Sequence, residues 1–133
     1  MGPEPNRRGE VVDFVNPVLT LYGIANCDTV RKARRWLDGQ GIAYRFHDLR
    51  KDGIGETQLR AWSEELGWEA LLNRRGTTWH TVPDTVKAGL DADAAIRLML
   101  EMPAIVRRPV LDLGDRRVVG FTQAHYQSLL GRR

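Results

Sequence analysis

The sequence predicts an α/β fold built on a four-stranded mixed sheet with flanking helices and a helical insertion. Short apolar strands and helical patterns follow one another as β-α-β near the start of the chain and as β-β-α near its end. The first two strands, joined by a helix, should be parallel, whereas the tight turn at Gly114-Asp115 favours an antiparallel hairpin. Between these halves, residues 54–102 show only helical patterns. This arrangement is thioredoxin-like.

The first half of the chain supplies two strands and one helix. Residues 19–22 form a short apolar strand that stops at Gly23, and residues 43–49 alternate in polarity as a second strand does. Between them, a helical pattern begins just after Cys27 and ends at Gly39 and Gly41. The apolar face of this helix consists of Val30, Ala33, Trp36 and Leu37.

The elements after residue 50 are predicted from the same kinds of pattern. A helix ends at Gly67, residues 68–73 add a helical turn or two, and residues 74–83 read as an irregular polar segment. Asp91 or Asp93 can cap a third helix that ends at Pro103. Residues 110–113 and 117–120 form the hairpin, and Thr122 caps the last helix. The inward positions of the three helices are Leu59, Trp62 and Leu66, then Ile96, Met99 and Leu100, then Tyr126, Leu129 and Leu130.

Composition narrows the class of protein. With 133 residues, 42% hydrophobic and 28% charged, the chain fits one globular domain, and it is neither disordered nor fibrous. We assign residues 1–17 to an N-terminal extension and residues 18–131 to the domain. No segment approaches the roughly 20 apolar residues that span a bilayer, and no signal region is evident. We therefore expect a cytoplasmic protein with no membrane partner.

Charge and cysteine content limit the chemistry. Twenty Lys and Arg against 17 Asp and Glu give a net charge of +3, which does not predict direct nucleic-acid binding. Cys27 is the single cysteine, so an internal disulfide and any multi-cysteine metal site are excluded. His47, His80 and His125 lack metal-ligand spacing. We expect no metal and no bound cofactor.

Cys27 is the candidate nucleophile. It lies where the first strand turns into the first helix, and unpaired N–H groups and the helix dipole favour a thiolate there. Arg31, one helical turn further on, is within reach of the same sulfur or of an anion bound to it, and we expect Arg31, Arg75 and Arg108 to bind the anion of the substrate. Val30 stands where a second cysteine would complete a C-x-x-C pair, so an external thiol such as glutathione must resolve a mixed disulfide. The alternative is a small buried apolar residue without chemistry.

Two basic motifs are candidates for anion binding. Arg107-Arg108-Pro109 precedes the third strand, and its proline is a candidate cis residue that would bring Arg108 near the thiol. Arg74-Arg75 is followed by Gly76 and two threonines in the polar segment. Either motif can also be read as solvated arginines on a surface loop. Trp79, in the same segment, is the tryptophan that could line a pocket.

Several motifs resemble the arsenate reductase (ArsC)/Spx family, and above all its YffB-like branch. They are LYGIANCDT at residues 21–29, RRWL at 34–37, LGWEALLN at 66–73, RGTTW at 75–79 and RRP at 107–109. The resemblance covers residues 18–130. It implies a thioredoxin-like fold and a cysteine thiolate that attacks arsenate, with glutathione and glutaredoxin completing the reduction.

The resemblance also implies site residues by matching position. These are Cys27 as nucleophile, Arg31 as the arginine of Cys-x-x-x-Arg, Arg108 before the cis-proline Pro109, and Arg75, or else Arg74, as the mid-chain arginine. We assign Asn26, Pro109 and Arg74 to glutathione binding. Two departures argue against arsenate as the native substrate. Gly23 replaces the reductases' histidine, and Gly120-Phe121 replaces their third oxyanion arginine.

The leading hypothesis is therefore a glutathione-dependent monothiol oxidoreductase, with glutathione as co-substrate, an oxidised thiol or oxyanion as substrate, and glutaredoxin as a candidate partner. The alternative is an Spx-like regulatory module that binds the RNA polymerase α subunit, although Val30 removes the C-x-x-C switch that such proteins commonly carry. A third reading keeps glutathione binding without catalysis.

Overall fold

The computed structural model describes residues 19–131, so the predicted extension, residues 1–17, lies outside the described residues. The elements, in chain order, are β2 (Leu19–Gly23), α1 (Asp28–Gly39), β3 (Tyr44–Asp48), α2 (Glu56–Leu66), α3 (Trp68–Leu71), α4 (Thr77–His80), α5 (Asp84–Ala88), α6 (Ala92–Glu101), the 3-10 helix η2 (Pro103–Ile105), β4 (Val110–Asp112), β5 (Arg117–Val119) and α7 (Gln123–Leu130). None of the helices in this part of the chain has the length and apolar character needed to span a bilayer.

The sheet confirms the predicted thioredoxin-like topology. Its strand order is β3-β2-β4-β5, with β2 parallel to β3 and antiparallel to β4. β4 and β5 form the expected antiparallel hairpin around Gly114-Asp115, because the Leu113 N–H donates to the Arg116 carbonyl at 2.8 Å. Gly114 has φ +96°, a conformation that glycine adopts without steric cost.

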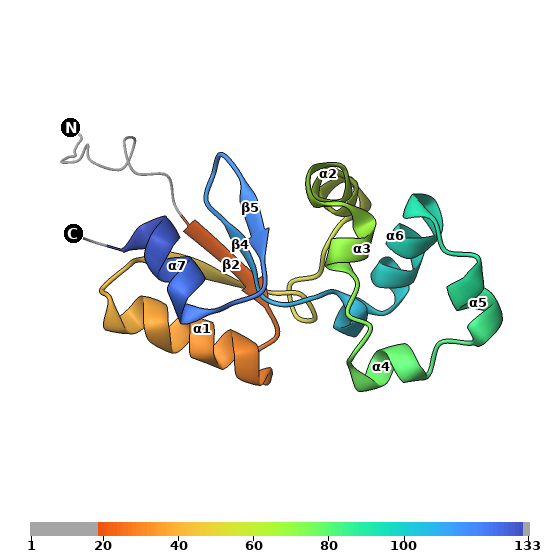
Figure 1. Cartoon of the computed structure of the whole chain (residues 1–133), viewed down its shortest axis with the longest axis horizontal. Helices are drawn as coiled ribbons and strands as arrows, with labels where there is room; N and C mark the ends of the chain where they lie inside the picture. The colour runs from red at the N-terminus through yellow and green to blue at the C-terminus, as the bar shows by residue number, and fades with distance from the viewer. Residues whose placement is uncertain (1–18, 132–133) are drawn as a thin grey trace.

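Two hydrophobic clusters cover the two faces of the sheet. Leu21 and Leu111 pair across β2 and β4 and pack with α1 and α7, where Tyr126 is fully buried. The next pair along these strands, Tyr22 and Val110, points to the opposite face because side chains alternate along a strand. That face packs against the helical insertion, which lies on the other side of the sheet from α1 and α7 (Figure 1).

The helical insertion departs from the sequence prediction in two places. Residues 74–83, expected to be irregular, contain α4, and α5 follows at once. Neither short helix has a buried residue, so neither shows the apolar periodicity that predicts helices. In α6, capped by Asp91 as one of the two predicted alternatives, Leu98 is buried and Leu100 is only half-buried.

Candidate functional site

The predicted nucleophile lies at the start of α1. Cys27 is the N-cap residue, with extended backbone angles, and its carbonyl accepts the first helical hydrogen bond from the Arg31 N–H at 2.9 Å. The side chain is half-buried, at the end of the loop that follows β2. The structure thus places the thiol beside free amides and within reach of solvent, instead of in apolar packing.

The local environment lowers the pKa of the Cys27 thiol. Partial burial raises this pKa, but the Val30 N–H and the Arg108 guanidinium stabilise the thiolate and oppose the effect of burial. The positive charge of Arg108 and the Thr29 N–H act in the same direction, and the net result is a pKa below that of an ordinary cysteine. Helix amides and a guanidinium therefore favour the thiolate.

Arg108 approaches the thiol from the loop that enters β4. The Arg108–Pro109 peptide bond is cis, as expected, and Pro109 is buried. One terminal nitrogen of Arg108 donates to the carbonyls of Ala104, at 2.5 Å, and Val106, at 2.9 Å. These two hydrogen bonds hold the guanidinium in place. Its positive charge lowers the pKa of the Cys27 thiol.

Gly23 and Val30 allow β2 and α1 to approach each other closely. They lie beside the loop of residues 24–27, called the thiol loop below because it carries Cys27. A Cβ atom at Gly23 would lie 2.7 Å from Val30 Cγ2 and 2.9 Å from Cγ1, and Val30 is fully buried. Any side chain at position 23 would therefore displace Val30. The two departures from the expected motifs, glycine before the loop and valine in place of a second cysteine, are thus complementary in shape.

Asp48 holds the thiol loop from the neighbouring strand, a contact that the sequence analysis missed. This carboxylate is buried at the end of β3 and accepts hydrogen bonds from the N–H groups of Ala25, at 3.3 Å, Arg50 and Lys51. Burial raises the pKa of Asp48, but the Lys51, Arg50 and Ala25 amides outweigh it and lower the pKa. An acidic residue ending an alternating strand is the only local signal for such a role.

The other predicted residues do not all gather at the sulfur. Arg31 pairs with Asp28 at 2.5 Å on the exposed side of α1, so its guanidinium is engaged by that carboxylate. Asn26 is exposed in the loop. Arg74 and Arg75 line a cavity of about 330 Å³ that does not include Cys27. Trp79 is outside this lining and stacks instead on Arg74 and Lys87, at 6.0 and 4.7 Å from its ring centre.

Arg107, which the sequence analysis left without a role, also lines the Arg74 and Arg75 cavity. One of its terminal nitrogens lies 3.6 Å from the place where a Cβ would stand on Gly120. Gly120 and Phe121 stand where the resemblance to the arsenate reductases implies a third arginine. A guanidinium from another element therefore borders the space that a side chain at Gly120 would enter.

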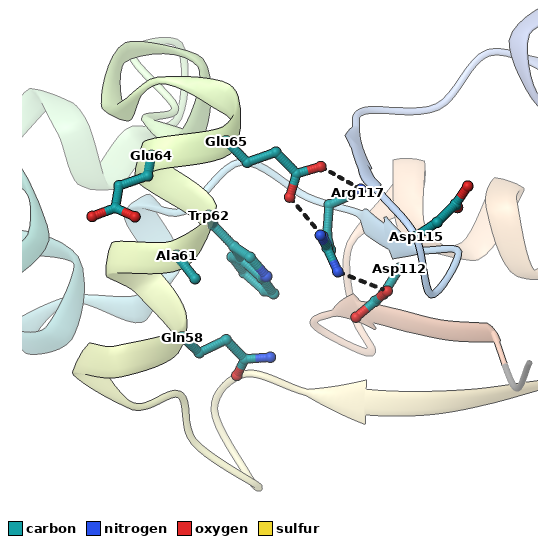
Figure 2. A pocket seen from close by; sticks show the side chains of 8 residues that line it. All are labelled: Gln58, Ala61, Trp62, Glu64, Glu65, Asp112, Asp115 and Arg117. Carbon is teal, nitrogen blue, oxygen red and sulfur yellow. Dashed lines mark hydrogen bonds and ion pairs between the residues drawn. The ribbon is translucent and has the colours of Figure 1, made fainter.

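A larger cavity of about 640 Å³ lies between α2 and the β4–β5 hairpin (Figure 2). Its lining is Gln58, Ala61, Trp62, Glu64, Glu65, Asp112, Asp115 and Arg117, and it contains none of the predicted site residues. Arg117 crosses it, donating to Glu65 and Asp112 at 2.7 and 3.4 Å. Within residues 19–131 no three His, Cys, Asp or Glu side chains gather as metal ligands would.

Comparisons with known proteins place the chain among close relatives. A solved YFFB protein is 48% identical with a TM-score of 0.81, and the match covers 85% of this chain and 99% of that one. An arsenate reductase (ArsC) related protein from Brucella melitensis is 45% identical with a TM-score of 0.72, covering 84% and 93%. A curated uncharacterized protein of Haemophilus influenzae is 37% identical over 111 residues, covering 84% and 97%.

More distant relatives are named as transcriptional regulators. A global transcriptional regulator Spx of Streptococcus agalactiae is 25% identical over 117 residues, covering 86% of this chain and 85% of that protein. The model of the ArsC family matches residues 22–129, nearly the whole of the described structure. The chain belongs to the ArsC family.

Proposed function

We propose that this protein is a glutathione-dependent monothiol oxidoreductase that works in the cytosol. The observation that carries the proposal is a single half-buried cysteine whose pKa is lowered by two helix amides and by Arg108. A thiolate is the nucleophile in thiol–disulfide exchange, and it requires no metal or bound cofactor. Membership of a family with structures described as arsenate reductase related supports thiol chemistry at this position.

The proposed cycle follows from the presence of a single cysteine, Cys27. The Cys27 thiolate attacks the glutathione sulfur of a mixed disulfide, the sulfur–sulfur bond breaks, and the substrate leaves as a thiolate that takes up a proton. Cys27 is then disulfide-bonded to glutathione. A second glutathione thiolate attacks this bond, which regenerates the Cys27 thiolate and releases glutathione disulfide. In sum, the mixed disulfide and one reduced glutathione become the substrate thiol and glutathione disulfide.

Turnover of a glutathionylated peptide tests the proposal. Wild-type protein with reduced glutathione should release the peptide thiol catalytically, and mass spectrometry should detect one glutathione on Cys27 after treatment with glutathione disulfide. Cys27→Ser, which replaces sulfur by an oxygen of similar size, should show neither. An adduct without turnover would support glutathione binding alone and would sink the enzymatic proposal.

The pH dependence of Cys27 alkylation tests the origin of the thiolate. Because Arg108 stabilises the thiolate, Arg108→Ala should move the midpoint of the iodoacetamide rate to higher pH than in the wild type. Arg108→Lys keeps the positive charge and should fall between the two. The control is Arg116→Ala, at an exposed position on the hairpin, which should leave the midpoint unchanged. A wild-type midpoint at that of free cysteine would contradict the proposed activation.

A regulatory role is the second candidate, and the similarity to proteins named Spx is the observation that favours it. In that case the chain would bind the RNA polymerase α subunit without turning over a thiol substrate. Co-purification of the α subunit with both wild type and Cys27→Ser, together with no peptide release, would favour this role over the enzyme.

A further inference from the structure

We propose that Arg107 binds substrate carboxylates and, with Arg74 and Arg75, makes the protein selective for anionic disulfides. This inference rests on the proposed thiol–disulfide exchange at Cys27 and names the chemical class of its substrates. The cavity that the three arginines share has a volume of about 330 Å³. Its remaining lining residues are Glu69, Leu72 and Asn73.

Backbone pairing brings the three arginines together from distant parts of the chain. The Arg107 N–H donates to the Leu71 carbonyl at 2.7 Å, and the Asn73 N–H donates to the Ile105 carbonyl at 2.8 Å. Leu72 and Val106 form the antiparallel bridge between these hydrogen bonds. The loop carrying Arg74 and Arg75 is thereby fixed beside Arg107.

The cavity carries an excess of positive charge. It holds three guanidinium groups and one carboxylate, Glu69, and among residues 19–131 none of the three arginines forms an ion pair. Arg74 is oriented by the rings of Trp68 and Trp79, whose centres lie 5.9 and 6.0 Å from its guanidinium carbon. Guanidinium groups this close repel one another, and an anion bound between them removes the repulsion. The paired N–H donors of a guanidinium match the two oxygens of a carboxylate.

One short segment connects the lining of the cavity to the residue that acts on Cys27. Arg107 lines the cavity, and the next residue, Arg108, acts on the Cys27 thiol. The Gly120 N–H donates to the Pro109 carbonyl at 2.8 Å, and Gly120 has no side chain to fill the space near the Arg107 guanidinium. In the proposed arrangement, a disulfide that reacts with Cys27 extends its anionic end past Arg108 towards these arginines. The protein would then select substrates by charge.

Single-turnover rates with two disulfides test this selectivity. Glutathione disulfide carries carboxylates, whereas 2-hydroxyethyl disulfide carries no charge. Arg107→Gln should slow the reaction of Cys27 with glutathione disulfide about tenfold, the loss expected for one charge-assisted hydrogen bond. It should leave the rate with 2-hydroxyethyl disulfide and the pH midpoint of alkylation unchanged. Arg107→Lys should lie between wild type and Gln, and Arg116→Gln should match the wild type.

Equal slowing with both disulfides, or no slowing with glutathione disulfide, would overturn the proposal. Equilibrium binding to Cys27→Ser separates this result from the proposed function, because it needs no reaction. S-methylglutathione should bind Cys27→Ser about tenfold more tightly than the double variant with Arg107→Gln. Equal affinities would refute the role of Arg107, and inorganic phosphate binding as tightly as S-methylglutathione would refute carboxylate selectivity. No reaction with either disulfide would count against the proposed function alone.

Discussion

Asp48 shows how one buried carboxylate supports the loop before Cys27 without touching Cys27 itself. Its oxygens accept hydrogen bonds from Ala25, in the thiol loop, and from Arg50 and Lys51, in the turn after β3. The Leu49 N–H adds a bond to the Gly23 carbonyl at 2.8 Å, just before that loop. The position of Cys27 therefore depends on the end of the neighbouring strand.

We predict that Asp48→Ala lowers the free energy of unfolding by about 1 kcal/mol, because it removes the acceptor of three partly buried N–H groups. Asp48→Asn, which keeps one oxygen, should cost less. Urea unfolding monitored by tryptophan fluorescence measures both. Asp38→Asn, on the exposed side of α1, is the matched control and should be close to neutral. A neutral effect of Asp48→Ala would show that the hydrogen bonds do not stabilise the fold.

The same residue gives a pH dependence with a defined sign. The pKa of Asp48 is lower in the folded protein than in the unfolded chain, so the ionised carboxylate stabilises the fold. This contribution is complete above the unfolded pKa of about 4 and is lost as the pH falls through the folded pKa. The stability difference between wild type and Asp48→Asn should therefore shrink below about pH 4. A constant difference from pH 7 to pH 3 would contradict the assignment.

Individual site residues differ in how well the sequence predicts them. Cys27 was placed correctly because a strand, a short loop and a helix face follow one another within twenty residues, so local patterns define its position. The predicted role of Arg31 in anion binding stays a prediction, and in the structure its guanidinium pairs with the neighbouring Asp28. The positions of Asp48 and Arg107 depend on contacts between segments far apart in the chain, which no local pattern records.

At the scale of elements, Arg117 ties the hairpin to the helical insertion. Its N–H and Nε donate to the two carboxylate oxygens of Glu65 in α2 at 2.9 and 2.7 Å, and a terminal nitrogen reaches Asp112 (Figure 2). The side chains of Arg117 and Glu65 are only 26% and 29% exposed. Partial burial and two-point contact distinguish this pair from ordinary surface ion pairs.

A double-mutant cycle of Arg117→Ala and Glu65→Ala should give a coupling energy of about 1 kcal/mol, at the upper end of exposed pairs. The comparison is the Arg60 and Glu56 pair, whose side chains are 43% and 56% exposed and should couple more weakly. Thermal unfolding of the four proteins in each cycle gives both values. Equal coupling in the two cycles would show that partial burial adds nothing to the Arg117 pair.

Elements with a continuous apolar face were predictable, and those without one were not. α1, α2 and α6 each bury several periodic residues, and each was identified from that pattern. α4 and α5 bury none, so their helical form depends on their surroundings, including the stacking of Trp79 on Lys87. The strand pairing followed correctly from the connections, because a helical crossover and a two-residue turn leave little choice.

For the whole molecule, burial predicts a gradient of stability. β2 and β4 are interior strands whose residues enter both hydrophobic clusters, whereas α4 and α5 contribute no buried residue. Native-state hydrogen exchange should find the slowest amides in β2 and β4, opening only with global unfolding, and the fastest in α4 and α5. Equal protection of α4 and β2 would contradict this gradient.

The segments that lead into and out of the helical insertion both act on the thiol loop. The chain leaves the sheet at Asp48, which binds Ala25, and returns at Arg108, which acts on Cys27. The Arg108 guanidinium is itself held by the carbonyls of Ala104 and Val106, at the end of the insertion. A displacement of the insertion relative to the sheet would therefore reach the Cys27 sulfur through both connections.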